Sequence, residues 1–265
     1  MRQLVAAVPL FAIVGSMVLF FWAVTKSARA FVLRRRDAES REALAEQANN
    51  LLTGVAATFA FFVGFAISAS WGAVTTAQTA VERQATAVSQ MAWQLGNIGD
   101  RAQSVALMEK LGAYVSAVTT EDRVALIKGT SARMPSAAAL DRFETALYAY
   151  ADEPTVNDRQ ASALVAAASD VSTAGAGVAA VANRALPRPL FVLLMVVGVL
   201  ASILMGISTV TYAQPSLIFI WCLIPAVSIT TVIALAYPFA MRSGGTTAPM
   251  QAVAEQLAGE PIPTG

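Results

Sequence analysis

Four long apolar stretches divide the chain, two before and two after a polar middle region. They lie at roughly 4–25, 51–74, 190–212 and 217–240. At about 1.5 Å of rise per residue, each is long enough to cross the ~30 Å apolar core of a bilayer as a helix. Backbone N–H and C=O groups must be paired inside lipid, so single segments of this kind cross only as helices. The pattern therefore predicts an all-α integral membrane protein with four transmembrane helices.

The polar residues between these stretches predict a helical domain inserted between the second and third spans. The expected order is transmembrane helix 1 at 1–25, a basic and polar connector at 26–50, transmembrane helix 2 at 51–74, a helical extramembrane domain at 75–187, transmembrane helix 3 at 188–213, transmembrane helix 4 at 215–240 and a flexible tail at 241–265.

Within this order, apolar residues at spacings of three and four predict the individual helices. The second span continues as one long helix to a break near Asn97–Asp100, and the connector contains a short polar helix at Asp37–Asn50. Later in the middle region, Thr119 and Asp122 predict a capping box, and Ser136 predicts a helix N-cap. No stretch alternates well enough to predict a β-strand.

Two of the spans carry the same ladder of small residues at a spacing of four. The second span has Gly64, Ser68 and Gly72, and the third has Gly198, Ser202 and Gly206. Such a stripe lets another helix approach closely. We expect these six residues to pack helices together, within one chain, between subunits, or both.

Composition narrows the possible functions. The chain is 56% hydrophobic and 13% charged with a formal net charge of +1, so it lacks the basic field of a nucleic-acid-binding protein. It has no histidine and one cysteine, Cys222, which lies inside an apolar stretch. There is no glycine-rich phosphate loop and no cluster with metal-ligand spacing. We therefore expect neither an enzyme nor a bound cofactor or metal.

Basic residues are concentrated in the connector, which carries Lys26, Arg29, the run 34–36 and Arg41. The positive-inside rule favours a cytoplasmic connector and an external middle domain. We expect a multi-pass protein of the plasma membrane, with the lipid bilayer as its first partner.

The second span also carries a family resemblance. Phe61–Phe65, followed by Trp71, Ala77, Val81, Ala85, Ala87–Val88 and Met91, resembles the bestrophin-like domain family of bacterial membrane proteins, as does the ending Pro238–Phe239. Four spans with a helical insert between the second and third are also similar to that family. The chain departs from the family pattern at three positions: Gln84 in place of glutamate, Tyr237 in place of a charged residue, and Ala240 before a missing glycine.

The resemblance implies a function. Bestrophins proper are pentameric anion channels, and the segment 60–65 is similar to the one that lines their narrow neck. This makes Phe61 and Phe65 candidate pore-lining residues, with Ala57 one turn earlier, in a homo-oligomeric anion channel. Two alternatives remain open: phenylalanines in a membrane helix often face lipid, and the small-residue ladders would equally suit a non-conducting accessory or scaffold subunit of a larger membrane complex.

Overall fold

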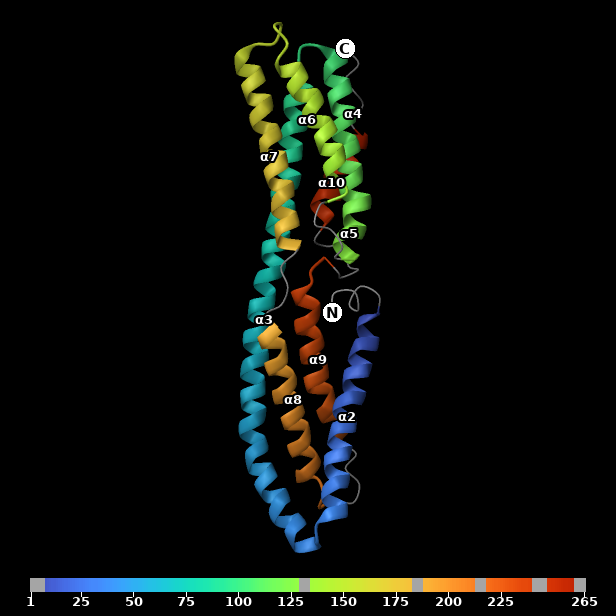
Figure 1. The fold of residues 1–265 in the computed structure, drawn as a ribbon, viewed down its shortest axis with the longest axis vertical. Coiled ribbons are helices and arrows are strands. Elements are labelled where there is room, and N and C mark those ends of the chain that lie inside the picture. Colours follow the sequence, from blue (N-terminus) through green and yellow to red (C-terminus); the bar gives the residue numbers. More distant parts are fainter. Residues whose placement is uncertain (1–7, 129–133, 183–187, 213–217, 240–246, 260–265) are drawn as a thin grey trace. The chain divides into compact units, whose positions relative to one another are not determined.

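The computed structural model describes residues 8–128, 134–182, 188–212, 218–239 and 247–259, in which every regular element is helical (Figure 1). The chain forms two compact units. Among the described residues, the first unit, here called the apolar unit, consists of 8–72, 188–212 and 218–237. The second, the polar unit, consists of 73–128, 134–182, 238–239 and 247–259.

The apolar unit is a bundle of helix α2 (Leu10–Arg35), the first part of α3 (Ala38–Gly96), α8 (Arg188–Ser208) and α9 (Ile218–Ala236). Helix α2 packs along both α8 and α9 (Figure 1). The corner between α2 and α3 is short, and it is held by a 2.6 Å hydrogen bond that Arg41 Nη2 donates to the carbonyl oxygen of Leu33.

The polar unit contains the second part of α3 with α4 (Arg101–Ala117), the π-helix η1 (Val118–Asp122), α5 (Arg123–Lys128), α6 (Ala137–Ala151), α7 (Asp158–Ala182) and α10 (Ala248–Gly259). Its core is one continuous cluster of apolar side chains. Met91, Leu95, Leu111, Phe143 and Leu147 are completely buried there. These residues recur at three- and four-residue spacing, so each helix buries a single stripe.

Helix α3 is a single helix of 59 residues, whereas the sequence predicted a separate connector helix before the second span. The continuation into the polar domain and the end of the helix just before Asn97 are confirmed. The expected separation fails because 38–53 contains neither proline nor glycine, and its alanine, leucine and glutamate residues favour a helix. For the same reason α2 extends through the basic residues to Arg35.

The expected capping box at Thr119 and Asp122 is wrong. The hydroxyl of Thr119 donates to the carbonyl oxygen of Val115 at 3.0 Å, while Asp122 accepts from the backbone N–H of Ser136 at 2.9 Å. The chain widens into a π-helix at this point instead of starting a new helix. Ser136 does stand at the N-cap of α6, but its side chain caps no backbone group and donates to Asp122 at 2.5 Å.

The tail is more ordered than predicted. Within 241–265, the segment Ala248–Gly259 forms α10, of 12 residues. Met250 and Val253 are buried in the core of the polar unit, with 2% and 7% of their surface exposed. This part of the predicted flexible tail is helical because its apolar stripe packs against the core of the same unit.

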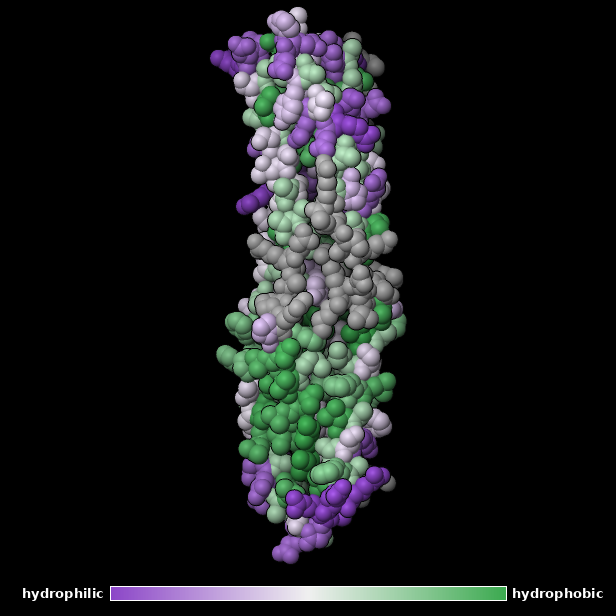
Figure 2. Space-filling view, viewed as in Figure 1, coloured by the Kyte–Doolittle hydropathy of each residue, from purple (hydrophilic) through white to green (hydrophobic). Residues whose placement is uncertain are grey.

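Five of the described helices, α2, α3, α7, α8 and α9, are long and apolar enough to cross a membrane, by length and composition alone. Four of them overlap the predicted spans, and the fifth, α7 (Asp158–Ala182), lies in the predicted extramembrane domain. Figure 2 shows hydrophobic residues gathered over the helices of the apolar unit. Large exposed side chains there include Phe11, Phe31, Phe61 and Ile224. So many exposed apolar groups are typical of a surface that contacts lipid or another subunit.

Candidate pore surface on helix α3

One face of α3 in the apolar unit carries the pore-lining and helix-packing candidates that the sequence predicted in the second span. Successive residues turn by about 100° around a helix. At that rate, Ala57, Phe61 and Phe65 fall within an arc of about 100° together with Gly64, Ser68 and Gly72. The phenylalanines and the first small-residue ladder therefore share one surface, which from here on we call the α3 face.

The α3 face is exposed in the single chain. Phe61 and Phe65 have 71% and 60% of their surface accessible, and the three ladder residues are also exposed. A Cβ atom added at Gly64 or Gly72 would meet nothing within 4 Å. The opposite side of the helix is buried, because Phe59, Val63 and Ala66 point into the apolar unit. The α3 face is thus the side of the helix that is left uncovered by the described residues of the unit.

The second ladder, on α8, has a different environment. Gly198, Ser202 and Gly206 are buried against α2. A Cβ atom at Gly198 would lie 3.2 Å from the ring of Phe21, and one at Gly206 would collide with the carbonyl oxygen of Thr25. The absence of side chains at these glycines lets α8 approach the backbone of α2 directly.

The Ser202 hydroxyl satisfies itself within α8, donating to the carbonyl oxygen of Gly198 at 2.9 Å. It therefore needs no partner on the neighbouring helix. The two ladders have the same sequence pattern, but one is used inside the chain and the other is left open.

In the polar unit, Gln84 occupies the position at which the family pattern has glutamate. Its side chain is 4% exposed, and its Nε2 donates to the hydroxyl of Tyr114 at 2.8 Å. A neutral amide is easier to bury than a carboxylate, because burial of an unpaired charge costs far more. Gln84 therefore joins α3 to α4 by a buried hydrogen bond.

Sequence analysis missed one buried polar pair, Asp122 with Ser136. The two residues are separated by 14 positions, and only the folded chain brings them together. Burial raises the pKa of the Asp122 carboxyl, and the two hydrogen bonds from Ser136 oppose that shift. In the sequence, Asp122 stands just before a short apolar segment, and this position was interpreted as part of a capping box with Thr119.

Within the described residues, no three histidine, cysteine, aspartate or glutamate side chains are grouped as a metal site would require. The two candidate functional features in the described chain are therefore the α3 face and the buried polar groups around Tyr114.

A family model, the bestrophin-like domain, matches residues 18–242. The chain belongs to the bestrophin-like domain family. The match includes all the residues of the α3 face and both small-residue ladders.

Solved structures agree with this assignment. A bacterial bestrophin homologue from Klebsiella pneumoniae, solved by zinc anomalous phasing, is similar with a TM-score of 0.66 at 15% identity, over 91% of this chain and 96% of that one. A point mutant of the Klebsiella homologue gives a TM-score of 0.68 at 14% identity, over 92% and 99%. A search of curated proteins found no significant match. At such identities the likeness establishes the fold, so this bestrophin-like protein is a multi-pass membrane protein with an all-helical fold.

Proposed function

We propose that this bestrophin-like protein is a homo-oligomeric ion channel of the cell membrane, selective for anions, with α3 lining the pore. The observation that carries the proposal is the uncovered α3 face. It combines two aromatic rings with three small residues on a helix whose other side is buried. A surface meant only for lipid has no need of a small-residue stripe, whereas close contact with another helix does.

The proposed membrane spans are α2, the first part of α3, α8 and α9. Helix α7 belongs to the polar domain in this proposal, although its composition would allow it to cross. Its apolar stretch is the least hydrophobic of the five candidates, and Asp158, Arg159 and Asp170 lie along the helix. Its apolar residues Leu164 and Val171 are buried in the core of the polar unit. A bilayer would gain little from a helix whose apolar stripe is already covered.

Assembly of identical chains would place the α3 faces around a common axis, and the resemblance to bestrophins favours five copies. The open ladder allows neighbouring helices to approach, while Phe61 and Phe65 narrow the lumen. The polar unit would then extend the pore as a vestibule.

The proposed selectivity relies on aromatic rings rather than on charge. The segment 51–74 contains no charged residue, so no ring of basic side chains can select the ion inside this span. Aromatic rings carry a positive edge that can face an anion, and an apolar constriction can gate by losing its water. We therefore assign the constriction to Phe61 and Phe65, with Ala57 one turn away.

Anion flux through reconstituted liposomes tests the constriction. The double variant Phe61→Ala with Phe65→Ala should raise the flux, because it widens and wets the neck. The matched control is Phe11→Ala with Phe31→Ala, since those rings are also exposed, at 79% and 64%, but lie on α2. Unchanged flux in the α3 variant, or an equal rise in the control, would contradict the pore assignment.

Particle symmetry in detergent tests the assembly and separates the channel from the accessory-subunit alternative. A symmetric ring with an open axis supports the channel. A monomer, or a single copy among different subunits, would overturn it and favour the accessory role. The variant Gly64→Leu should break the ring while leaving the fold of each chain intact, because Gly64 is exposed and a Cβ atom added there has nothing within 4 Å.

A further inference from the structure

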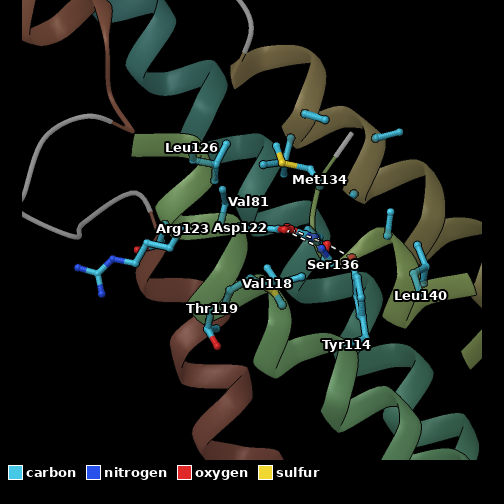
Figure 3. A pocket seen from close by; sticks show the side chains of 18 of the residues that line it. Val81, Tyr114, Val118, Thr119, Asp122, Arg123, Leu126, Met134, Ser136 and Leu140 are labelled. Atoms are coloured by element: carbon cyan, nitrogen blue, oxygen red, sulfur yellow. Dashed lines mark hydrogen bonds between the residues drawn. The ribbon is translucent and has the colours of Figure 1, made fainter. Parts of the chain in front are cut away.

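The polar unit contains a cavity of about 300 Å³ that the channel proposal does not use. It lies among α3, α4, η1, α6, α7 and α10, which all contribute lining residues (Figure 3). Its volume is at the lower end of the ~300–1,000 Å³ typical of ligand pockets, so any ligand must be small. Most of the lining is apolar, with Val81, Leu126 and Met250 among the contributors.

A buried carboxylate lies in the wall of this cavity. Asp122 has 4% of its surface exposed, and it accepts two hydrogen bonds from Ser136, at 2.9 Å from the backbone N–H and at 2.5 Å from the hydroxyl. Figure 3 shows both bonds, and it shows the Arg123 side chain pointing away from them. No lysine or arginine in the described part of the chain forms an ion pair with Asp122. Buried charges in proteins are normally paired, and the described residues supply hydrogen bonds to Asp122 but no countercharge.

The surroundings add negative rather than positive potential. Burial raises the pKa of Tyr114 to about 12, and the charges of Asp122 and Glu144 contribute to that rise. Gln84 donates from Nε2 to the hydroxyl of Tyr114, and its side-chain carbonyl oxygen is a further hydrogen-bond acceptor in the wall. The polar groups at this point therefore suit a hydrogen-bond donor that carries a positive charge.

A glycine on α7 keeps the cavity open. A Cβ atom at Gly175 would lie 3.1 Å from the hydroxyl of Tyr114 and 3.6 Å from Nε2 of Gln84. One added methyl group would thus press directly on the polar pair. By contrast, Gly177, two residues later on the same helix, has nothing within 4 Å of the same added atom and does not line the cavity.

We propose that this cavity binds a primary ammonium group carried on a short apolar chain. The ammonium supplies the missing countercharge to Asp122 and has three donors for the acceptors around it. The apolar chain lies along the aliphatic part of the wall. This inference is independent of conduction, because it concerns a site inside each chain rather than the α3 face.

Calorimetric titration of the full-length protein in detergent with n-butylammonium chloride tests the proposal. Butan-1-ol, which has the same apolar chain without the charge, is the control ligand. We expect saturable binding of the amine only. Asp122→Asn removes the charge; its Oδ1 can still accept from the Ser136 backbone N–H, while its Nδ2 would donate to the Ser136 hydroxyl instead of accepting from it. This variant should weaken binding roughly tenfold or more. Asp170→Asn removes an exposed carboxylate elsewhere and should bind like the wild type.

Two results would overturn the proposal: no saturable binding of the amine to the wild type, or equal affinity in the wild type and Asp122→Asn. If circular dichroism shows that Asp122→Asn does not fold, the comparison of Gly175→Ala with Gly177→Ala tests the site instead. Gly175→Ala should weaken binding, whereas Gly177→Ala should not. Equal affinity in these two variants would also refute the site. Binding is measured without ion flux, so a failure here leaves the channel proposal to its own tests.

Discussion

Replacing Gly206 with alanine tests whether α8 rests directly on the backbone of α2. The added Cβ atom would collide with the carbonyl oxygen of Thr25, and it would lie 3.1 Å from the Cβ of Ala28 and 3.2 Å from the backbone nitrogen of Arg29. Two of these three atoms belong to a helix backbone, which cannot move aside as a side chain can. The two helices must therefore separate to accommodate the methyl group.

The expected cost follows from two opposing effects. Overpacking of a well-packed core costs about 1–3 kcal/mol, while glycine to alanine inside a helix gains roughly 0.5–1 kcal/mol. Gly206→Ala should therefore destabilise the chain by up to about 2 kcal/mol. In Gly64→Ala the added Cβ atom has nothing within 4 Å, so this variant should show only the stabilisation of the helix by alanine. Gly198→Ala should fall between them, because the Phe21 ring atoms at 3.2 and 3.3 Å can shift.

Thermal unfolding in detergent, followed by tryptophan fluorescence, measures this series. One kcal/mol corresponds to a shift of about 2–4 °C in Tm for chains of about this size. We expect Tm to rank Gly64→Ala above the wild type and Gly206→Ala below it. Measurement at several protein concentrations separates changes in the chain from changes in assembly. Equal Tm values for the Gly64 and Gly206 variants would refute the direct seating of α8 on α2.

Three further predictions concern the polar unit. The pKa of Tyr114 is raised from 10.0 to about 12 in the folded chain. The neutral phenol therefore stabilises the fold fully below pH 10, and this stabilisation is lost as the pH rises towards 12. Tyr114→Phe should reduce this alkaline loss, measured by unfolding at a series of pH values, and an unchanged alkaline loss would contradict it. The pKa of Asp122 is raised above its ordinary value of 3.8. The protonated carboxyl therefore stabilises the folded chain fully below pH 3.8, and this stabilisation is lost as the pH rises. The stability of Asp122→Asn relative to the wild type should therefore increase from acid to neutral pH, and a flat difference would show that burial does not disfavour the charge. Met250→Ala should destabilise the protein by about 2–5 kcal/mol, because it removes a buried apolar side chain from the core of the polar unit. The exposed Glu255→Ala on the same helix should leave Tm unchanged.

The long helices were predictable because their signals are local. The apolar spacing from Val74 to Ile98 identified the continuation of the second span, and the polar break after Gly96 marked its end. The fusion with the preceding segment was missed because the change from polar to apolar residues was taken for a boundary. Such a change alters the environment of a helix without breaking its backbone hydrogen bonds.

The polar cavity was not predictable, because its parts come together only in the folded chain. Asp122 and Ser136 lie 14 residues apart, and Gln84 and Tyr114 lie 30 apart. Each has an ordinary local explanation, a cap or a surface polar group. No clear sequence pattern predicts the π-helix that places Asp122 in the interior, because its residues, including Thr119 and Thr120, are common in other structures.

The contrast between the two ladders could not be read from their residues, which are the same. Gly206 is enclosed because Thr25, far away in the sequence, lies opposite it, whereas a Cβ atom at Gly64 has no described atom within 4 Å. A small-residue motif shows that a helix can be approached closely, but whether another helix packs there depends on the rest of the fold.

This contrast has a consequence for how the chain tolerates mutation. Larger residues at Gly198 or Gly206 impair the individual chain, so a screen for expression or thermal stability would detect them. The same changes at Gly64 or Gly72 would pass such a screen and be detected only by an assay that requires several copies to meet. Comparing the two kinds of screen, position by position along α3, would map the surface on which selection acts through assembly rather than through folding.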